Sequence, residues 1–284
     1  MVRTGVPGPL AVLGIGLRLL FFIGLLAAGL AVQRAAVADD SALEGAALPS
    51  SAETQPVAAH RPKRAKFERE RASRDARHVA DWVVDSGDNR RMPFVIVDKK
   101  DAKVFVFHAD GRLRGAAPAL LGLARGDDAV PGIGDRELSS IRPEEKTTPA
   151  GRFVAALGGN MRGEDVLWVD YDTATSMHRV LTTNPKERRL QRLATPTPLD
   201  NRISFGCINV PKKFYENVVQ PAFTGTDGIV YVLPETRPAR EFFATYDVEE
   251  HAREQSASQP GPQRSRQSDM PIASARAAAA GPSR

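Results

Sequence analysis

The sequence predicts a mainly β fold, a β-sandwich with one or two short helices, flanked by a disordered N-terminal linker and a disordered C-terminal tail. Short runs of β-branched and aromatic residues follow one another between positions 94 and 233, which is typical of proteins built from several short strands. One segment in this range, after Pro211, has apolar residues at helical spacing. Both ends of the chain lack apolar periodicity, which predicts that they do not pack.

Residues 1–38 are predicted to be an export signal. Arg3 and Arg18 supply positive charge, residues 19–32 are uninterruptedly apolar, and Ala36-Val37-Ala38 is typical of a cleavage site. The alternative is an uncleaved anchor, because residues 6–32 are numerous enough to cross a bilayer if Arg18 is tolerated among them. We expect an exported protein of the periplasm or cell envelope, which meets the membrane only through this segment if it is uncleaved.

Residues 39–90 are predicted to be a low-complexity, charged linker that is helical in part. The stretch 61–77 holds eight basic and three acidic residues, and this net charge of +5 equals the surplus of the whole chain. Such a run is typical of a solvated linker or helix surface, and the alternative is a patch that contacts an anionic wall or membrane. Export argues against nucleic acid as a partner. A helix near 60–81 would dock through Val79, Trp82 and Val83.

The packed domain is expected over residues 91–234. Two apolar runs on either side of 98–101 predict a hairpin, and Asp110-Gly111 predicts a second tight turn. The strands that we expect are 94–97, 104–107, 152–157, 166–169, 177–181 and 229–233. Residues 235–284 are predicted to be a mostly disordered tail, in which the residues expected to dock are Phe242, Phe243 and Tyr246.

Cys207 is the only cysteine in the chain, so no intramolecular disulfide can form. In an exported protein an idle thiol is exposed to oxidation, so a single cysteine indicates a reactive group; the alternative is a small buried residue. Cys207 follows Gly206 and approaches a predicted helix, a setting in which backbone N–H groups can stabilise an oxyanion. Sulfur attacks as the thiolate, so we expect a base or a positive charge nearby.

Position selects one of the five histidines as the partner of Cys207. His178 is the one on a predicted core strand close to Cys207 in sequence, although a single histidine on a strand is also compatible with a structural role. The others lie before the domain, beside a turn or in the tail: His60, His78, His108 and His251. The sequence has no glycine-rich phosphate loop, paired-histidine helix or cysteine ladder, so we expect no cofactor and no metal.

Residues 204–209, Ser-Phe-Gly-Cys-Ile-Asn, resemble the nucleophile motif of the L,D-transpeptidase (YkuD) family. Residues 148–153, Thr-Pro-Ala-Gly-Arg-Phe, are similar to a second family segment, which leads into a strand. The resemblance covers about 93–233 and implies a YkuD-like β-sandwich that acts on peptidoglycan stem peptides. It implies that Cys207 attacks the carbonyl between the L- and D-centres of a stem tetrapeptide, and that an amine acceptor then resolves the acyl-enzyme.

The resemblance also implies a role for each matching residue. Cys207 would be the nucleophile and His178 the general base and acid. Ser204, Gly206 and Asn209 would shape the loop, and the backbone N–H groups of Gly206 and Cys207 would face the oxyanion.

Three features depart from the family pattern and leave the acceptor open. Phe205 stands where many members have His, Arg179 stands where Gly is common, and the stretch 182–202 is longer than usual and would serve as a lid or an acceptor-selecting loop. One alternative is a hydrolase on the same scaffold, an L,D-carboxypeptidase or a cross-link-cleaving amidase. Another is a non-catalytic wall-binding module, against which the retention of both Cys207 and His178 argues.

Three arginines are candidates for gripping the carboxylates of a stem peptide, because guanidinium pairs bidentately with carboxylate. An ordinary surface role is the simpler interpretation of each one taken singly, so none is assigned to the site. The three are Arg152, Arg192 and Arg202.

Overall fold

The computed structural model of the chain describes residues 61–258, which belong to one compact unit. The predicted export signal, the first part of the predicted linker and the end of the predicted tail lie outside the described residues. Among the helices of residues 61–258, none is both long and apolar enough to cross a membrane.

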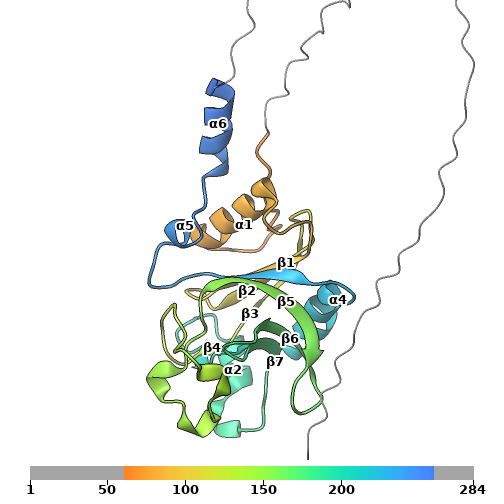
Figure 1. Cartoon of the computed structure of the whole chain (residues 1–284). Coiled ribbons are helices and arrows are strands. Elements are labelled where there is room, and N and C mark those ends of the chain that lie inside the picture. Colours follow the sequence, from red (N-terminus) through yellow and green to blue (C-terminus); the bar gives the residue numbers. More distant parts are fainter. Residues whose placement is uncertain (1–60, 259–284) are drawn as a thin grey trace, which may run out of the picture. The chain divides into compact units, whose positions relative to one another are not determined.

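Eight strands are hydrogen-bonded into one sheet, in the order β3-β2-β1-β10-β5-β6-β7-β9 (Figure 1). Neighbouring strands are antiparallel, except that β1 is parallel to β10 and β7 is parallel to β9. β4 (Leu121–Gly122) and β8 (Arg202–Ser204) form a second, two-stranded sheet. The predicted mainly β class is therefore confirmed. The strands of the large sheet are β1 (Phe94–Asp98), β2 (Lys103–Phe107), β3 (Leu113–Pro118), β5 (Gly151–Gly159), β6 (Asp165–Asp170), β7 (Thr175–Arg179), β9 (Ile208–Val210) and β10 (Gly228–Val232).

Each of the six predicted strands overlaps an observed one, and four observed strands were not predicted. β3 has the sequence Leu-Arg-Gly-Ala-Ala-Pro, which carries no β-branched residue. β4, β8 and β9 have only two or three residues each, too few for a pattern of alternation to be visible.

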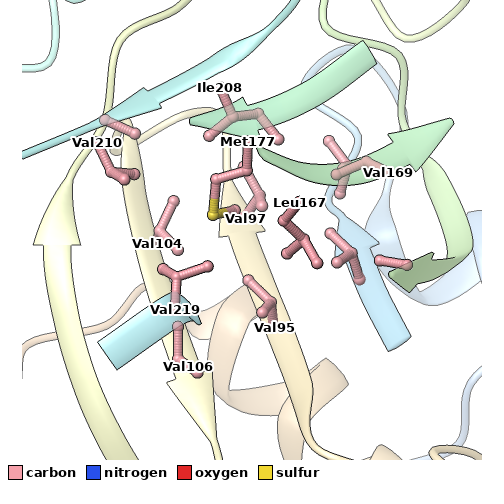
Figure 2. Close-up of a cluster of buried hydrophobic side chains, with 14 of the residues drawn as sticks. Val95, Val97, Val104, Val106, Leu167, Val169, Met177, Ile208, Val210 and Val219 are labelled. Carbon is pink, nitrogen blue, oxygen red and sulfur yellow. The ribbon is translucent and has the colours of Figure 1, made fainter. Parts of the chain in front are cut away.

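The central strands are buried on both faces, which explains why their sequences are continuous apolar runs. In β1, Val95 and Val97 point into one apolar cluster, while Phe94 and Ile96 point into another on the opposite face. Figure 2 shows the first cluster, in which valines of β1 and β2 meet Leu167, Met177 and Ile208 from the far half of the sheet. This cluster fixes the positions of β7 and β9, the strands that carry His178 and Asn209.

The second cluster is covered by α1 (Arg74–Ser86), which lies against β1 (Figure 1). Its first turn is capped by Ser73, whose side chain accepts a hydrogen bond from the N–H of Ala76, and it ends at Gly87 in the left-handed conformation. Val79 and Val83 are fully buried, and Trp82 packs beside them. The helix expected near 60–81 is present only from residue 74 and continues to residue 86, and it docks through the expected side chains.

The predicted helix after Pro211 is continuous but contains a wider π-helical turn. It consists of α3 (Lys212–Phe214), the π turn η5 (Tyr215–Val219) and α4 (Gln220–Phe223). Tyr215, Val219 and Phe223 are buried in the first cluster, so the helix closes that face of the sheet.

Residues 235–258 were expected to be mostly disordered, and the structure differs. They form α5 (Ala239–Phe242) and α6 (Val248–Ser258), and both helices contact α1. Residues 61–90 pack as well, so the folded part extends beyond 91–234 on both sides. Composition does not reveal these contacts, because they depend on long-range pairs such as Tyr246 Oη donating to Asp85. The remaining short helices are η1 (Ile133–Asp135), η2 (Leu138–Ser140), η3 (Pro143–Glu145), η4 (Pro185–Glu187) and α2 (Arg189–Ala194).

Candidate active site

Cys207 lies in the short loop between β8 and β9, and its side chain is half-buried. The preceding Gly206 has φ +139°, and a Cβ built on it would lie 2.8 Å from the carbonyl oxygen of Thr147. Both the angle and the close approach require glycine. The loop therefore presents the sulfur in a position that few other sequences could give it.

Hydrogen bonds from two hydroxyl groups hold this loop. Ser204 Oγ donates to the carbonyl of Cys207 (2.6 Å) and accepts from the N–H of Gly206 (3.1 Å). Thr148 Oγ1 donates to the carbonyl of Gly206 (2.8 Å) and accepts from the N–H of Gly122 (2.8 Å). The expectation that the Gly206 N–H faces an oxyanion needs correction, because Ser204 already accepts from it. The N–H of Cys207 stays the predicted oxyanion donor.

β7 places His178 beside this loop. In the parallel pair of β7 and β9, His178 lies opposite Asn209. Ser176 is two residues earlier on β7, hence on the same face, and its Oγ lies 3.7 Å from Cys207 Sγ. Because residues two apart on a strand share a face, the position of His178 on a predicted strand could have identified Ser176 from the sequence.

The orientation of the His178 ring is set by a backbone carbonyl. Its Nδ1 lies 2.7 Å from the carbonyl oxygen of Arg179. A carbonyl can only accept, so Nδ1 carries the proton and donates it. In the neutral ring Nε2 then has a free lone pair, and Asn209 Nδ2 lies 3.4 Å from it.

Cys207 and His178 shift each other's pKa toward the charged forms. Burial would raise the pKa of the Cys207 thiol, but the hydrogen bond and charge interaction with His178, together with Ser176, lower it overall. Burial would lower the pKa of His178, but the interaction with Cys207 and the Arg179 carbonyl raise it overall. Both shifts bring the two pKa values closer together and so reduce the cost of moving the thiol proton to the imidazole.

The long stretch 182–202 carries η4 and α2 and reaches the site through Arg189. Its Nη1 donates to Asn209 Oδ1 over 2.6 Å. Sequence reasoning did not identify Arg189, because the contact spans 20 residues and no local pattern marks it.

The three candidate arginines are engaged within the chain. Arg152 pairs with Asp88, and Arg202 pairs with the buried Glu235. Arg192 donates to backbone carbonyls of its own segment. This supports the structural interpretation of all three.

Cys207 and His178 line different hollows in the surface. Cys207 lines a narrow cavity of about 60 Å³ whose wall includes Phe205 and Ile133. His178 and Ser176 line a cleft of about 230 Å³ that also includes Trp168. His178 also lines a cleft of about 300 Å³ whose wall includes Arg179 and Lys212.

No group of three or more histidine, cysteine, aspartate or glutamate side chains within residues 61–258 is placed to hold a metal ion. The chemistry that the described residues themselves offer is that of a thiol, an imidazole and hydrogen-bond donors.

No family model matches the sequence, and no curated protein matches it. The fold is similar to that of solved L,D-transpeptidases. One from Xylanimonas cellulosilytica is 14% identical, with 50% of this chain and 60% of that chain covered and a TM-score of 0.31. L,D-transpeptidase 3 from Mycobacterium tuberculosis, in complex with a faropenem-derived adduct, is 15% identical, with 50% and 60% covered and a TM-score of 0.31.

The helical cell shape determining protein Pgp2 from Campylobacter jejuni is also similar, at 15% identity and a TM-score of 0.34. The alignment covers 57% of this chain and 52% of that chain. The chain thus spans between 52% and 60% of the length of these three structures.

Proposed function

We propose that the protein is a peptidoglycan-modifying cysteine acyltransferase, an L,D-transpeptidase, that acts in the periplasm or cell envelope. The observation that carries the proposal is the pairing of the chain's single cysteine with His178, whose Nδ1 is held by the Arg179 carbonyl. Stem peptides of peptidoglycan are proposed as substrates because residues 204–209 resemble the nucleophile motif of that family.

In the proposed first step, Nε2 of His178 takes the thiol proton of Cys207, and the thiolate attacks the carbonyl carbon between the L- and D-centres of the donor stem. The carbonyl electrons move to oxygen, which the Cys207 N–H stabilises. As the carbonyl re-forms, the C–N bond breaks, and the leaving amine takes the proton from His178. The product is a thioester on Cys207.

In the second step, the amine of an acceptor attacks the thioester and gives its proton to Nε2 of His178. The C–S bond breaks, and the proton returns to the sulfur. The clefts of about 300 Å³ and 230 Å³ that His178 lines offer space for substrate groups beside the imidazole.

The proposal is tested by incubating the purified protein with tetrapeptide-containing muropeptides and analysing the products by mass spectrometry. We expect cross-linked dimers from the wild type, and no product from the Cys207→Ala variant. An adduct of the expected donor mass on Cys207 should accumulate when no acceptor is supplied.

Two other outcomes would contradict the proposal in different ways. Shortened or separated stems without dimers would show a hydrolase, in which water resolves the thioester. No adduct and no product from wild-type protein that is folded by circular dichroism would exclude a cysteine enzyme and leave a wall-binding module.

A further inference from the structure

Arg189 begins α2 and is largely buried, with its side chain 11% exposed. Its Nε pairs with the carboxylate of Glu187, and its Nη1 donates to Asn209 Oδ1 over 2.6 Å. Both contacts hold the guanidinium against the oxygen of the Asn209 amide.

The contact decides how the Asn209 amide is turned. A guanidinium has donors and no acceptor, so Asn209 must present its oxygen to Arg189. The NH₂ group then faces inward, 3.4 Å from Nε2 of His178 and 3.3 Å from the carbonyl oxygen of Cys207. Asn209 is 1% exposed, so water is not at hand to replace either contact.

An inward NH₂ group favours one protonation state of His178. It can donate to Nε2 only when that nitrogen keeps its lone pair, and it opposes a proton there. The positive charge of Arg189 acts in the same direction and lowers the pKa of His178 against the raising effect of Cys207. A flipped amide would do the opposite, because its oxygen would accept from a protonated Nε2.

We propose that Arg189 is a positioning residue that locks the Asn209 amide with its NH₂ group toward His178 and so favours the neutral imidazole with Nε2 unprotonated in the resting protein. The proposal rests on the proposed acyl transfer only for its effect on turnover. It gives the long 182–202 segment a role in the reaction, since α2 supplies the residue that fixes Asn209.

Other charged groups also face His178 and define its surroundings. Cys207 contacts it from the loop before β9, and Arg179 follows it on β7, where it pairs with Asp165 and Glu216. The clefts that His178 lines also include Arg162, Glu164 and Lys212. None of these groups changes in the variants below. Glu187, which pairs with Arg189, loses this partner in Arg189→Met and can keep a cationic partner in Arg189→Lys.

The test compares the full chain as wild type, Arg189→Met, Arg189→Lys and Arg192→Met. Arg192 is the matched control, because it lies on the same helix and donates only to carbonyls of its own segment. The titration of His178 is followed by NMR through its ring Cε1–H, which is assigned by its loss in His178→Gln. Acyl transfer between muropeptides is measured on the same samples.

We expect the His178 midpoint to move to higher pH in Arg189→Met and to stay near the wild-type value in Arg189→Lys and Arg192→Met. We expect acyl transfer by Arg189→Met to fall about tenfold, the size of one lost hydrogen bond to a charged group. Should Arg189→Met not fold, Arg189→Leu replaces it, since leucine, like methionine, has no donor for Asn209 Oδ1 and is expected to raise the midpoint too.

An unchanged His178 midpoint in a folded Arg189→Met or Arg189→Leu variant would overturn the proposal, even if transfer fell, because the residue would then be structural only. An equal shift in Arg192→Met would overturn it as well. The titration needs no substrate, so it decides the role of Arg189 even if the wild type shows no acyl transfer.

Discussion

Gly206 has φ +139°, and its Cα faces the backbone of Thr147 so closely that a Cβ would approach the carbonyl oxygen to 2.8 Å. The neighbouring Cys207 can face His178 only if this backbone conformation forms. At the scale of single residues, the reactivity of the site therefore depends on groups that do no chemistry themselves.

The Gly206→Ala variant is expected to unfold more easily by about 1–3 kcal/mol, because the angle and the contact with Thr147 are both unfavourable for a side chain. Its thiol should also react more slowly with iodoacetamide. Gly159→Ala is the matched control, since a Cβ there meets nothing within 4 Å. Equal stability and reactivity of the two variants, by thermal unfolding and alkylation rate, would contradict the account.

Thr148→Val tests the second hydroxyl of the loop. The variant removes a donor to the Gly206 carbonyl and an acceptor for the Gly122 N–H in a fully buried place. We expect a loss of about 1–3 kcal/mol in denaturant unfolding together with slower alkylation of Cys207. Thr224→Val, at an exposed hydroxyl, should change stability by no more than about 0.5 kcal/mol. The account fails here if Thr148→Val behaves like the control.

At the scale of elements, a buried ionic cluster ties the chain after β10 to the loops around the site. Lys99, which is fully buried, donates to Asp127 (3.0 Å) and to the carbonyl of Thr148 (3.0 Å). Glu235 lies 3.8 Å from Lys99 and accepts from Arg202 at the start of β8. The cluster therefore links β1, the segment that carries Thr148 and the strand that leads into the Cys207 loop.

Lys99→Met should destabilise the protein by about 3–5 kcal/mol, because it leaves buried carboxylates without one of their partners. The matched control is Lys100→Met, whose ammonium pairs with Asp75 at the surface with 45% of the side chain exposed. That control should cost about 0–1 kcal/mol. Denaturant unfolding measures the stability of both variants. Similar losses of unfolding free energy in the two would show that the buried cluster stabilises the fold no more than a surface ion pair does.

The lowered pKa of Asp127 predicts how the free energy of unfolding changes with pH. Burial would raise the pKa of its carboxyl, but hydrogen bonds from Thr236, from the N–H of Glu235 and from Lys99 hold the pKa well below the ordinary value of 3.8. The carboxylate therefore stabilises the fold above pH 3.8, and this contribution is lost as the pH falls below that value. Urea unfolding between pH 6 and pH 2 should show a smaller decline for Asp127→Asn than for the wild type. Parallel curves would refute this linkage.

At the scale of the whole molecule, local pattern predicts the central strands but not the edges of the sheet. β1, β2 and β10 are continuous β-branched and aromatic runs because both of their faces are buried. β9 has only three residues. It forms because it pairs with β7 on one side and because Asn209 forms an antiparallel β-bridge with Leu120 on the other. Such strands form because of pairing with segments that are distant in sequence, so a short stretch of sequence does not predict them.

The same limit applies to the site. Cys207 and His178 could be chosen from the sequence because the chain has one cysteine and few histidines. The loop roles of Ser204, Gly206 and Asn209 came from the resemblance of residues 204–209 to the family motif. Arg189 could not be found, since its contact depends on how the 182–202 segment folds back onto Asn209. The helices α5 and α6 escaped prediction, because their composition is that of a solvated tail, although docking of Phe243 and Tyr246 was expected and is observed.

The central claim is that His178 activates the Cys207 thiol, and the rate of Cys207 alkylation by iodoacetamide as a function of pH tests it most directly. The thiol is the only one in the chain, so the rate reports on this residue alone. The interaction with His178 predicts a midpoint below 9.0 in the wild type, and a higher midpoint in His178→Gln, which cannot take the proton. The same midpoint in both proteins, or a wild-type midpoint at or above 9.0, would contradict the account.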